Sequence, residues 1–197
     1  MLPRFSSALF AWSHKLDNEI PGTSAGVLKS LNQVTRQHTA AAKTWLQWVK
    51  AIRQKQPGLL VLLSHTLDDA LEIGRENSGE TVTLAQINMR YVKKNDQDNP
   101  IVFVLGCTTG VADQELVSFA GRFRDQGAAL VVGTITPVAG ERSAAVVKAV
   151  IAKLAQKRAE PARFGELMRD VRRDLLSQGE LTALCTTSFG DASWLVG

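Results

Sequence analysis

The stretches LLVLLSH (residues 59–65) and IVFVLGC (residues 101–107) decide the expected fold of this chain. Each begins with a short, continuous apolar run, which is typical of a strand that is buried on both faces in a parallel sheet covered by helices. The two strands follow one another along the chain with one helix expected between them. We therefore expect them to be neighbours in the sheet, about 4.8 Å apart.

Helical and strand-like patterns alternate over most of the remaining chain. Trp45, Trp48, Val49 and Ile52 lie at helical spacing, which predicts an amphipathic helix with an apolar stripe. The alternation predicts an α/β fold in which helices flank a mostly parallel sheet. We expect helices at residues 40–54, 84–92, 113–127, 141–157 and 163–177, and further strands at residues 128–135 and 181–189.

The first 40 residues differ from the rest of the chain. They contain Pro3 and Pro21 and show little periodicity, so we expect an irregular lead-in over residues 1–40 and one folded domain over residues 41–197. The N-terminus lacks a sustained apolar core and a small-residue cleavage site, which makes it a poor signal peptide.

Composition narrows the class of protein. The 197 residues are 45% hydrophobic and 21% charged, the balance of a globular domain. Two cysteines are too few for a disulfide framework, and their strand-end positions favour free thiols in a reducing compartment, so we expect a cytoplasmic protein. No run approaches the roughly 18 apolar residues of a membrane span. The net charge of +4 is scattered and has no aromatic stacking set beside it, so neither membrane nor nucleic acid is an expected partner.

Two residues with catalytic chemistry follow the two buried strands. His65 comes one residue after the first run, and Cys107 comes one residue after the second. In an open parallel sheet the functional crevice lies beyond the carboxyl ends of the strands. There an imidazole can raise the thiolate fraction of a cysteine or act as general base and acid in acyl transfer. Backbone N–H groups at Cys107 and Thr66 are placed to hold the oxyanion of such a reaction.

The pattern alone leaves other interpretations open. A cysteine after a buried strand is more often an inert core thiol, and a lone strand-end histidine is more often structural. A phosphate-binding turn at GCTTG (residues 106–110) is disfavoured, because that turn lacks a P-loop lysine and the GxGxxG spacing. His14, His38 and His65 are dispersed in the sequence, so we expect neither a metal nor a cofactor.

Four segments, in order, resemble the CHAT domain, the caspase- and separase-related family of cysteine proteases. The resemblance implies a three-layer caspase-like fold, with Cys107 as nucleophile and His65 as general base and acid. Thr66 stands where caspase-like proteases usually have glycine. The matching segments are LLVLLSHT (residues 59–66), PIVFVLGCTTG (residues 100–110), GAALVVGTITPVAGERSA (residues 127–144) and FGDASW (residues 189–194).

The resemblance also implies a substrate pocket, lined by the strand that ends at Thr134 and the loop after it. Asp68, Asp69, Glu72 and Asp113 lie just beyond the two strand ends, and an acidic pocket would favour cleavage after Arg or Lys. The alternative for each is structural: a helix N-cap for Asp113 and solvated loop carboxylates for the others.

Two functions follow as expectations. The first is a regulated endopeptidase that cuts a protein or peptide substrate and is switched on by a partner or an attached sensor domain. The alternative is a catalytically inactive scaffold for protein interaction. Caspase-like folds normally place two strands before the histidine strand, and residues 1–40 show no convincing strand, so either the chain is a C-terminal portion of a longer protein or those strands are missing or unrecognised.

Overall fold

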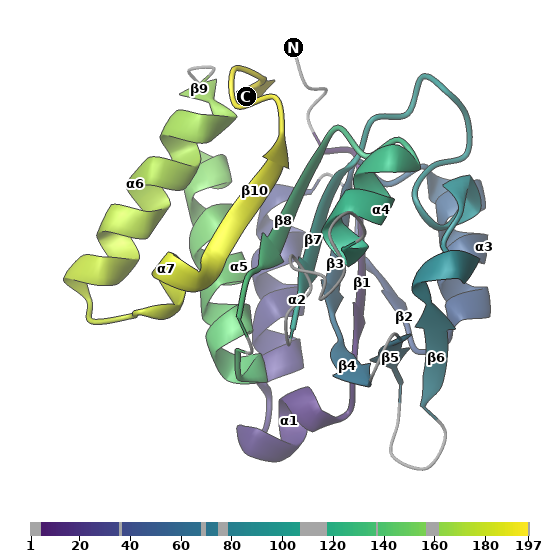
Figure 1. Ribbon diagram of the computed structural model, residues 1–197, viewed down its shortest axis with the longest axis horizontal. Helices are drawn as coiled ribbons and strands as arrows, with labels where there is room; N and C mark the ends of the chain where they lie inside the picture. The colour runs from purple at the N-terminus through teal and green to yellow at the C-terminus, as the bar shows by residue number, and fades with distance from the viewer. Residues whose placement is uncertain are drawn as a thin grey trace.

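A six-stranded sheet forms the middle of the molecule. The computed structural model describes residues 5–35, 37–67, 70–74, 79–106, 118–136, 138–156 and 162–196. The strands of the sheet are β1 (Ala8–Trp12), β2 (Ala40–Ala42), β3 (Leu59–Leu63), β7 (Ile101–Leu105), β8 (Leu130–Thr134) and β10 (Thr186–Gly190). They lie in the order β10-β8-β7-β3-β1-β2, and all neighbours are parallel except the pair β8 and β10 (Figure 1). The mostly parallel α/β sheet expected from the sequence is confirmed.

The two apolar runs that predicted the fold lie side by side. β3 and β7 pair in parallel, with Leu59 opposite Ile101 and Leu63 opposite Leu105. Successive side chains of a strand point to opposite faces, and both faces of these strands are buried, which is why every position is apolar. The connection between them differs from the single helix that we expected.

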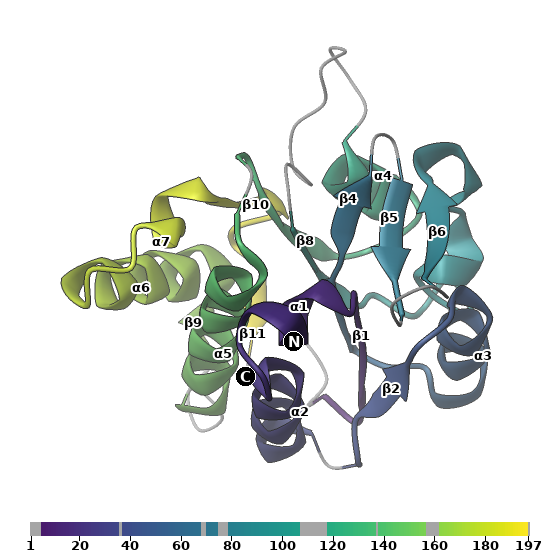
Figure 2. The ribbon, with the colours of Figure 1, turned by 90° about the horizontal axis from the view of Figure 1, so that it is seen from below.

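Helices cover both faces of the sheet and enclose two apolar cores. One core lies against α1 (Lys15–Glu19), α2 (Thr23–Val34), α5 (Gly140–Gln156), α6 (Phe164–Ser177) and α7 (Thr182–Cys185). The other core lies against α3 (Trp45–Lys55) and α4 (Phe119–Asp125). Seen from below, α2, α5 and α6 lie on one side of the sheet and α3 and α4 on the other (Figure 2).

A small antiparallel sheet occupies the connection from β3 to β7. It consists of β4 (His65–Leu67), β5 (Ala70–Ile73) and β6 (Glu80–Thr83) in that order. Leu71, Ile73 and Val82 join the core on the α3 and α4 side, so this sheet belongs to that layer (Figure 2).

The helix expected at residues 84–92 is instead two short 3-10 helices, η1 (Leu84–Gln86) and η2 (Met89–Tyr91). The backbone of Ile87 is extended, with φ −66° and ψ 120°, and this ends the first turn. The side chain of Asn88 then accepts a hydrogen bond from the Arg90 N–H and caps the second turn. Ile87 and Val92 are buried as expected, so the apolar spacing was right but the continuous helix was wrong.

The expectation of an irregular lead-in over residues 1–40 was also wrong. β1 lies inside the central sheet, paired with β3 on one side and β2 on the other. Its residues Ala8 to Ala11 are buried, and α2 packs on the same core through Val27 and Leu31. A strand of five residues with two alanines carries too weak a signal to be recognised alone. The two strands expected before the histidine strand are therefore present.

Boundaries shift at two other predicted elements. α4 begins at Phe119 and is capped by the Ser118 side chain, whereas the start expected at residue 113 lies outside the described residues. Gly127, with φ +100°, follows the end of this helix. The strand expected over residues 181–189 begins as the short helix α7 and continues as β10.

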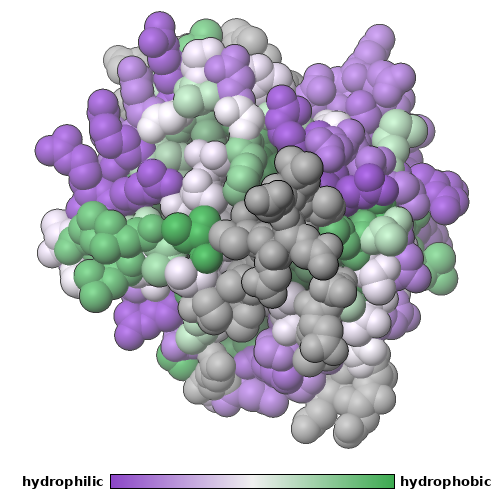
Figure 3. All heavy atoms as spheres, in the orientation of Figure 1, coloured by the Kyte–Doolittle hydropathy of each residue, from purple (hydrophilic) through white to green (hydrophobic). Residues whose placement is uncertain are grey.

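Apolar side chains gather on the surface where α6 meets α7. Leu176, Leu181 and Leu184 are 37%, 66% and 63% exposed, and Figure 3 shows apolar atoms over this part of the molecule. Within the described residues, no helix is both long and apolar enough to cross a membrane.

Candidate functional site

The ends of β3 and β7 touch at the residues that precede the two predicted catalytic positions. Gly106 lies so close to Ser64 that a Cβ atom on Gly106 would overlap the Ser64 carbonyl oxygen and lie 3.4 Å from its carbonyl carbon. A residue without a side chain is therefore needed for this close approach. His65 follows Ser64 directly, and Cys107 follows Gly106 directly. Cys107 itself lies outside the described residues, so the position of its sulfur stays a prediction.

Gly106 is also held from its other side, by the end of β8. The Thr134 hydroxyl donates a hydrogen bond to the Gly106 carbonyl oxygen, and the Thr134 side chain is fully buried. We expected Thr134 to bind substrate. That role stays a prediction. In the structure the Thr134 hydroxyl fixes the Gly106 carbonyl next to Cys107, a contact that the sequence did not reveal.

His65 begins β4 and is partly buried. Burial is the main reason why the pKa of His65 lies below its usual value of 6.5, because desolvation disfavours the charged ring. The positive charge of Lys15 lowers this pKa further, while the carboxylate of Glu72 acts in the opposite direction. The neutral ring, which can accept a proton, is therefore the main form of His65 at pH 7.

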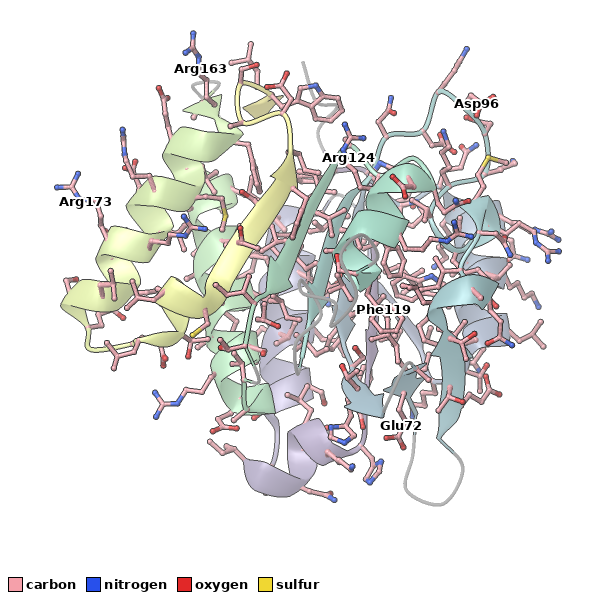
Figure 4. The ribbon with its side chains drawn as sticks, viewed as in Figure 1. Glu72, Asp96, Phe119, Arg124, Arg163 and Arg173 are labelled. Atoms are coloured by element: carbon pink, nitrogen blue, oxygen red, sulfur yellow. The ribbon has the colours of Figure 1, made fainter. Side chains whose placement is uncertain are left out.

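Glu72 and His14 lie beside His65, a placement that the sequence analysis missed. Glu72 lies on β5 directly opposite His65, and its carboxylate Oε1 is 3.9 Å from Nδ1 of His14 (Figure 4 labels Glu72). The side chains of His14 and Glu72 are only 19% and 12% exposed. Glu72 is thus not the solvated loop carboxylate that we considered, and His14 and His65 are not dispersed in space.

Pairing between distant strands explains this arrangement. The Ser13 N–H donates to the Leu63 carbonyl at 2.9 Å, and the Gly74 N–H donates to the Trp12 carbonyl at 2.9 Å. These bonds tie the end of β1 to the ends of β3 and β5. Residue spacing carries no signal for such contacts, since they depend on which strands lie side by side.

Of the other predicted site residues, the structure describes Thr66 but not the three aspartates. Thr66 lies on β4 opposite Leu71. Asp68, Asp69 and Asp113 lie outside the described residues, so their substrate-binding role stays a prediction. The described residues bring together no group of three His, Cys, Asp or Glu side chains able to hold a metal ion.

Asp191 lies at a turn in the segment FGDASW. Its carboxylate accepts hydrogen bonds from the Ser193 N–H at 2.8 Å and from the Ser193 hydroxyl at 2.7 Å. These bonds lower the pKa of Asp191 below its ordinary value. Asp191 therefore has a structural role.

Comparison with known proteins gives matches of structure only. No family model matches the sequence, and no curated protein matches it either. The Arg-specific cysteine proteinase gingipain R (RGPB) superposes with a TM-score of 0.67 and 17% identity, over 98% of this chain and 48% of that one. The complex of Porphyromonas gingivalis RgpB pro- and mature domains gives a TM-score of 0.72 and 15% identity, over 97% and 48% of the two chains. Caspase-1 from Spodoptera frugiperda gives 0.53 and 12%, over 96% and 87%. The chain has a caspase-like fold.

These structural matches confirm the caspase-like fold that the resemblance to CHAT domains implied. Identities of 12–17% carry the likeness no further than the fold, and the narrower assignment to CHAT domains stays a prediction. The chain spans about half the length of the gingipain chains that it matches.

Proposed function

We propose that this protein is a cysteine endopeptidase of the CHAT or caspase-like type, in which Cys107 is the nucleophile and His65 is its general base and acid. The contact between Ser64 and Gly106 carries the proposal, because it brings together the backbone positions just before the two residues. The caspase-like fold, which the chain shares with gingipain R and Caspase-1 from Spodoptera frugiperda, supports it.

In this mechanism His65 takes the thiol proton of Cys107, and the thiolate attacks the carbonyl carbon of the scissile peptide bond. The tetrahedral intermediate collapses to a thioester when the C–N bond breaks, and His65 gives its proton to the departing amine. Water then attacks the thioester carbonyl while His65 accepts a proton from it. The C–S bond breaks, the proton returns to the thiolate, and the acid product leaves.

The backbone N–H groups of Thr66 and Cys107 are our candidates for the oxyanion site. Asp68 and Asp113 are the candidates for binding a basic side chain before the cleaved bond, because a carboxylate pairs with Arg or Lys. We propose that Thr134 contributes to the substrate site indirectly, since its hydroxyl holds the Gly106 carbonyl.

The test is a cleavage assay on a fluorogenic peptide library with basic, acidic and apolar residues before the reporter group. We expect Cys107→Ala and His65→Ala each to lose activity by about a hundredfold or more while keeping the native circular dichroism spectrum. Cys185→Ala is the matched control, because Cys185 is a partly exposed free thiol at the end of α7 to which the mechanism gives no role. Cleavage by Cys107→Ala at the rate of the parent protein would refute the proposal.

The second candidate function is an inactive caspase-like scaffold, and Thr66 in the place of the usual glycine favours it. Iodoacetamide separates the two functions without a substrate. An activated Cys107 is expected to react much faster than Cys185 near neutral pH, whereas equal, slow labelling of both cysteines indicates a scaffold.

We further propose that the peptidase works in the cytoplasm under the control of a partner or an attached sensor domain. The free thiol of Cys185 fits a reducing compartment. The match to only half of each gingipain chain is consistent with a catalytic half that another polypeptide segment completes.

A further inference from the structure

We propose that Glu72 is a positioning residue for His65 and that His14 in turn holds the Glu72 carboxylate. This inference rests on the proposed function, since it gives His65 a catalytic role. It adds to the Cys107–His65 pair a third residue, which lies on β5, and a fourth, which lies just after the end of β1.

The strand register places Glu72 and His65 on the same face of the small sheet. They are directly opposite each other on the antiparallel strands β4 and β5. Side chains of such pairs lie on one face with their Cβ atoms about 5 Å apart. A glutamate at this distance reaches the ring of a neighbouring histidine.

The Glu72 carboxylate is poorly satisfied by the residues described around it. Its Oε2 atom is buried without a hydrogen-bond partner among them, and so is Nδ1 of His14, which lies 3.9 Å from Oε1. Gly79 closes the other side, because a Cβ atom there would overlap the carboxylate and lie 3.1 Å from Cγ of Glu72. A buried carboxylate without a partner is costly in free energy. The His65 ring, when it is protonated, supplies Glu72 with the missing positive charge and hydrogen-bond donor.

The charges around His65 give Glu72 a specific task. Lys15 and His14 both disfavour a proton on His65, as burial does, and among the described residues that act on this ring Glu72 alone favours it. During acyl transfer His65 must carry the thiol proton of Cys107 for part of the cycle. The Glu72 carboxylate stabilises that protonated ring and opposes the charges of Lys15 and His14.

Histidine titration tests the contact without any substrate. In a Cys107→Ala protein, the NMR titration midpoint of His65 is expected to move to lower pH in Glu72→Gln, because the carboxylate is lost while the shape is kept. In His14→Gln the midpoint is expected to move to higher pH, because a positive neighbour is lost. Glu72→Asp, which retains the charge, is expected to lie between the parent protein and Glu72→Gln.

Glu80→Gln is the matched control. Glu80 lies on the adjacent strand β6, and its carboxylate accepts the Trp45 N–H at 2.7 Å, so the same chemical change there affects structure only. With Cys107 present, we expect Glu72→Gln to slow iodoacetamide labelling of Cys107 at pH 7 by about tenfold, since a positioned base accounts for a factor of roughly 100 or more. Glu80→Gln is expected to leave the labelling rate unchanged.

An unchanged His65 midpoint in Glu72→Gln, or an equal shift in Glu80→Gln, would overturn the inference even if the protein is a peptidase. Conversely, a protein that cleaves nothing and labels both cysteines equally refutes the peptidase function, while the histidine titration still decides whether Glu72 acts on His65. Should Glu72→Gln fail to fold, Glu72→Asp decides the question, because it keeps the charge and moves it away from the ring; an unchanged His65 midpoint in that variant counts against the inference.

Discussion

Replacing Thr134 by valine removes the hydroxyl that holds the Gly106 carbonyl and keeps the shape of the side chain. Thr134 is fully buried, so the carbonyl oxygen loses this partner in a place that water does not replace. An orphaned buried acceptor costs about 1–3 kcal/mol. For a chain of this size, each kcal/mol lowers the melting temperature by about 2–4 °C, so we expect a decrease of about 2–12 °C.

The protein offers a closely matched control in Thr186→Val. Thr186 lies opposite Thr134 in the pairing of β8 with β10, is 3% exposed, and donates its hydroxyl to the Thr182 carbonyl at 3.0 Å. Both substitutions delete one buried bond from a threonine hydroxyl to a backbone carbonyl. Urea unfolding is therefore expected to show similar losses of about 1–3 kcal/mol for the two variants.

Catalysis is where the two variants are expected to differ. Only Thr134 acts on the peptide unit beside Cys107, and a misplacement of about 1 Å in an active site can cost a factor of roughly 100. We expect kcat/KM to fall at least about tenfold in Thr134→Val and to stay within about twofold of the parent protein in Thr186→Val. Equal activity of the two variants would refute the argument, as would an unfolding free energy of Thr134→Val within about 0.5 kcal/mol of the parent value.

Three further predictions concern the same strand ends and the start of α2. Gly106→Ala places a methyl group against the Ser64 carbonyl. We expect the free energy of unfolding, measured with urea, to fall by about 1–3 kcal/mol and Cys107 labelling by iodoacetamide to be lost. Retained stability and labelling would contradict the role of this contact. Asp17→Ala removes the acceptor of the Ser24 N–H at 2.9 Å and of the Ser24 hydroxyl at 2.5 Å, and is expected to cost about 1–2 kcal/mol by the same measurement. Burial lowers the pKa of His65, so the unfolded chain binds a proton at this residue more readily than the folded protein does. The free energy of unfolding is therefore expected to fall as the pH drops from 6.5 through the folded pKa. His65→Gln is expected to remove this part of the pH dependence.

The sequence predicted the centre of the fold well because that part is decided by local composition. β3 and β7 are apolar at every position, since both faces of each strand are buried. Such continuous apolar runs can be recognised as buried strands from the sequence alone. The strand-end positions of His65 and Cys107 followed from those two runs alone. Helices α5 and α6 were equally clear, because each has a long apolar stripe of helical period.

The surroundings of His65 could not be predicted, because they depend on contacts between distant segments. His14 reaches the site only because β1 lies next to β3, and Glu72 reaches it because the chain after His65 turns back as β5. A helix was expected at residues 84–92 because two short turns can place apolar residues at the same spacing as one helix. The cap at Asn88 was the local signal that could have corrected it.

The place of β1 in the sheet bears on how this protein can be shortened. A chain that started at residue 41 would match the sequence-based domain boundary, but it would lose the strand between β3 and β2. The hydrogen-bonding edge of β3, apolar along its whole length, would then face solvent and offer itself to other chains. Such a shortened protein would be expected to aggregate rather than to fold as a smaller peptidase, and it would also lack His14. The N-terminal segment that looks most dispensable in the sequence is a part that recombinant expression has to keep.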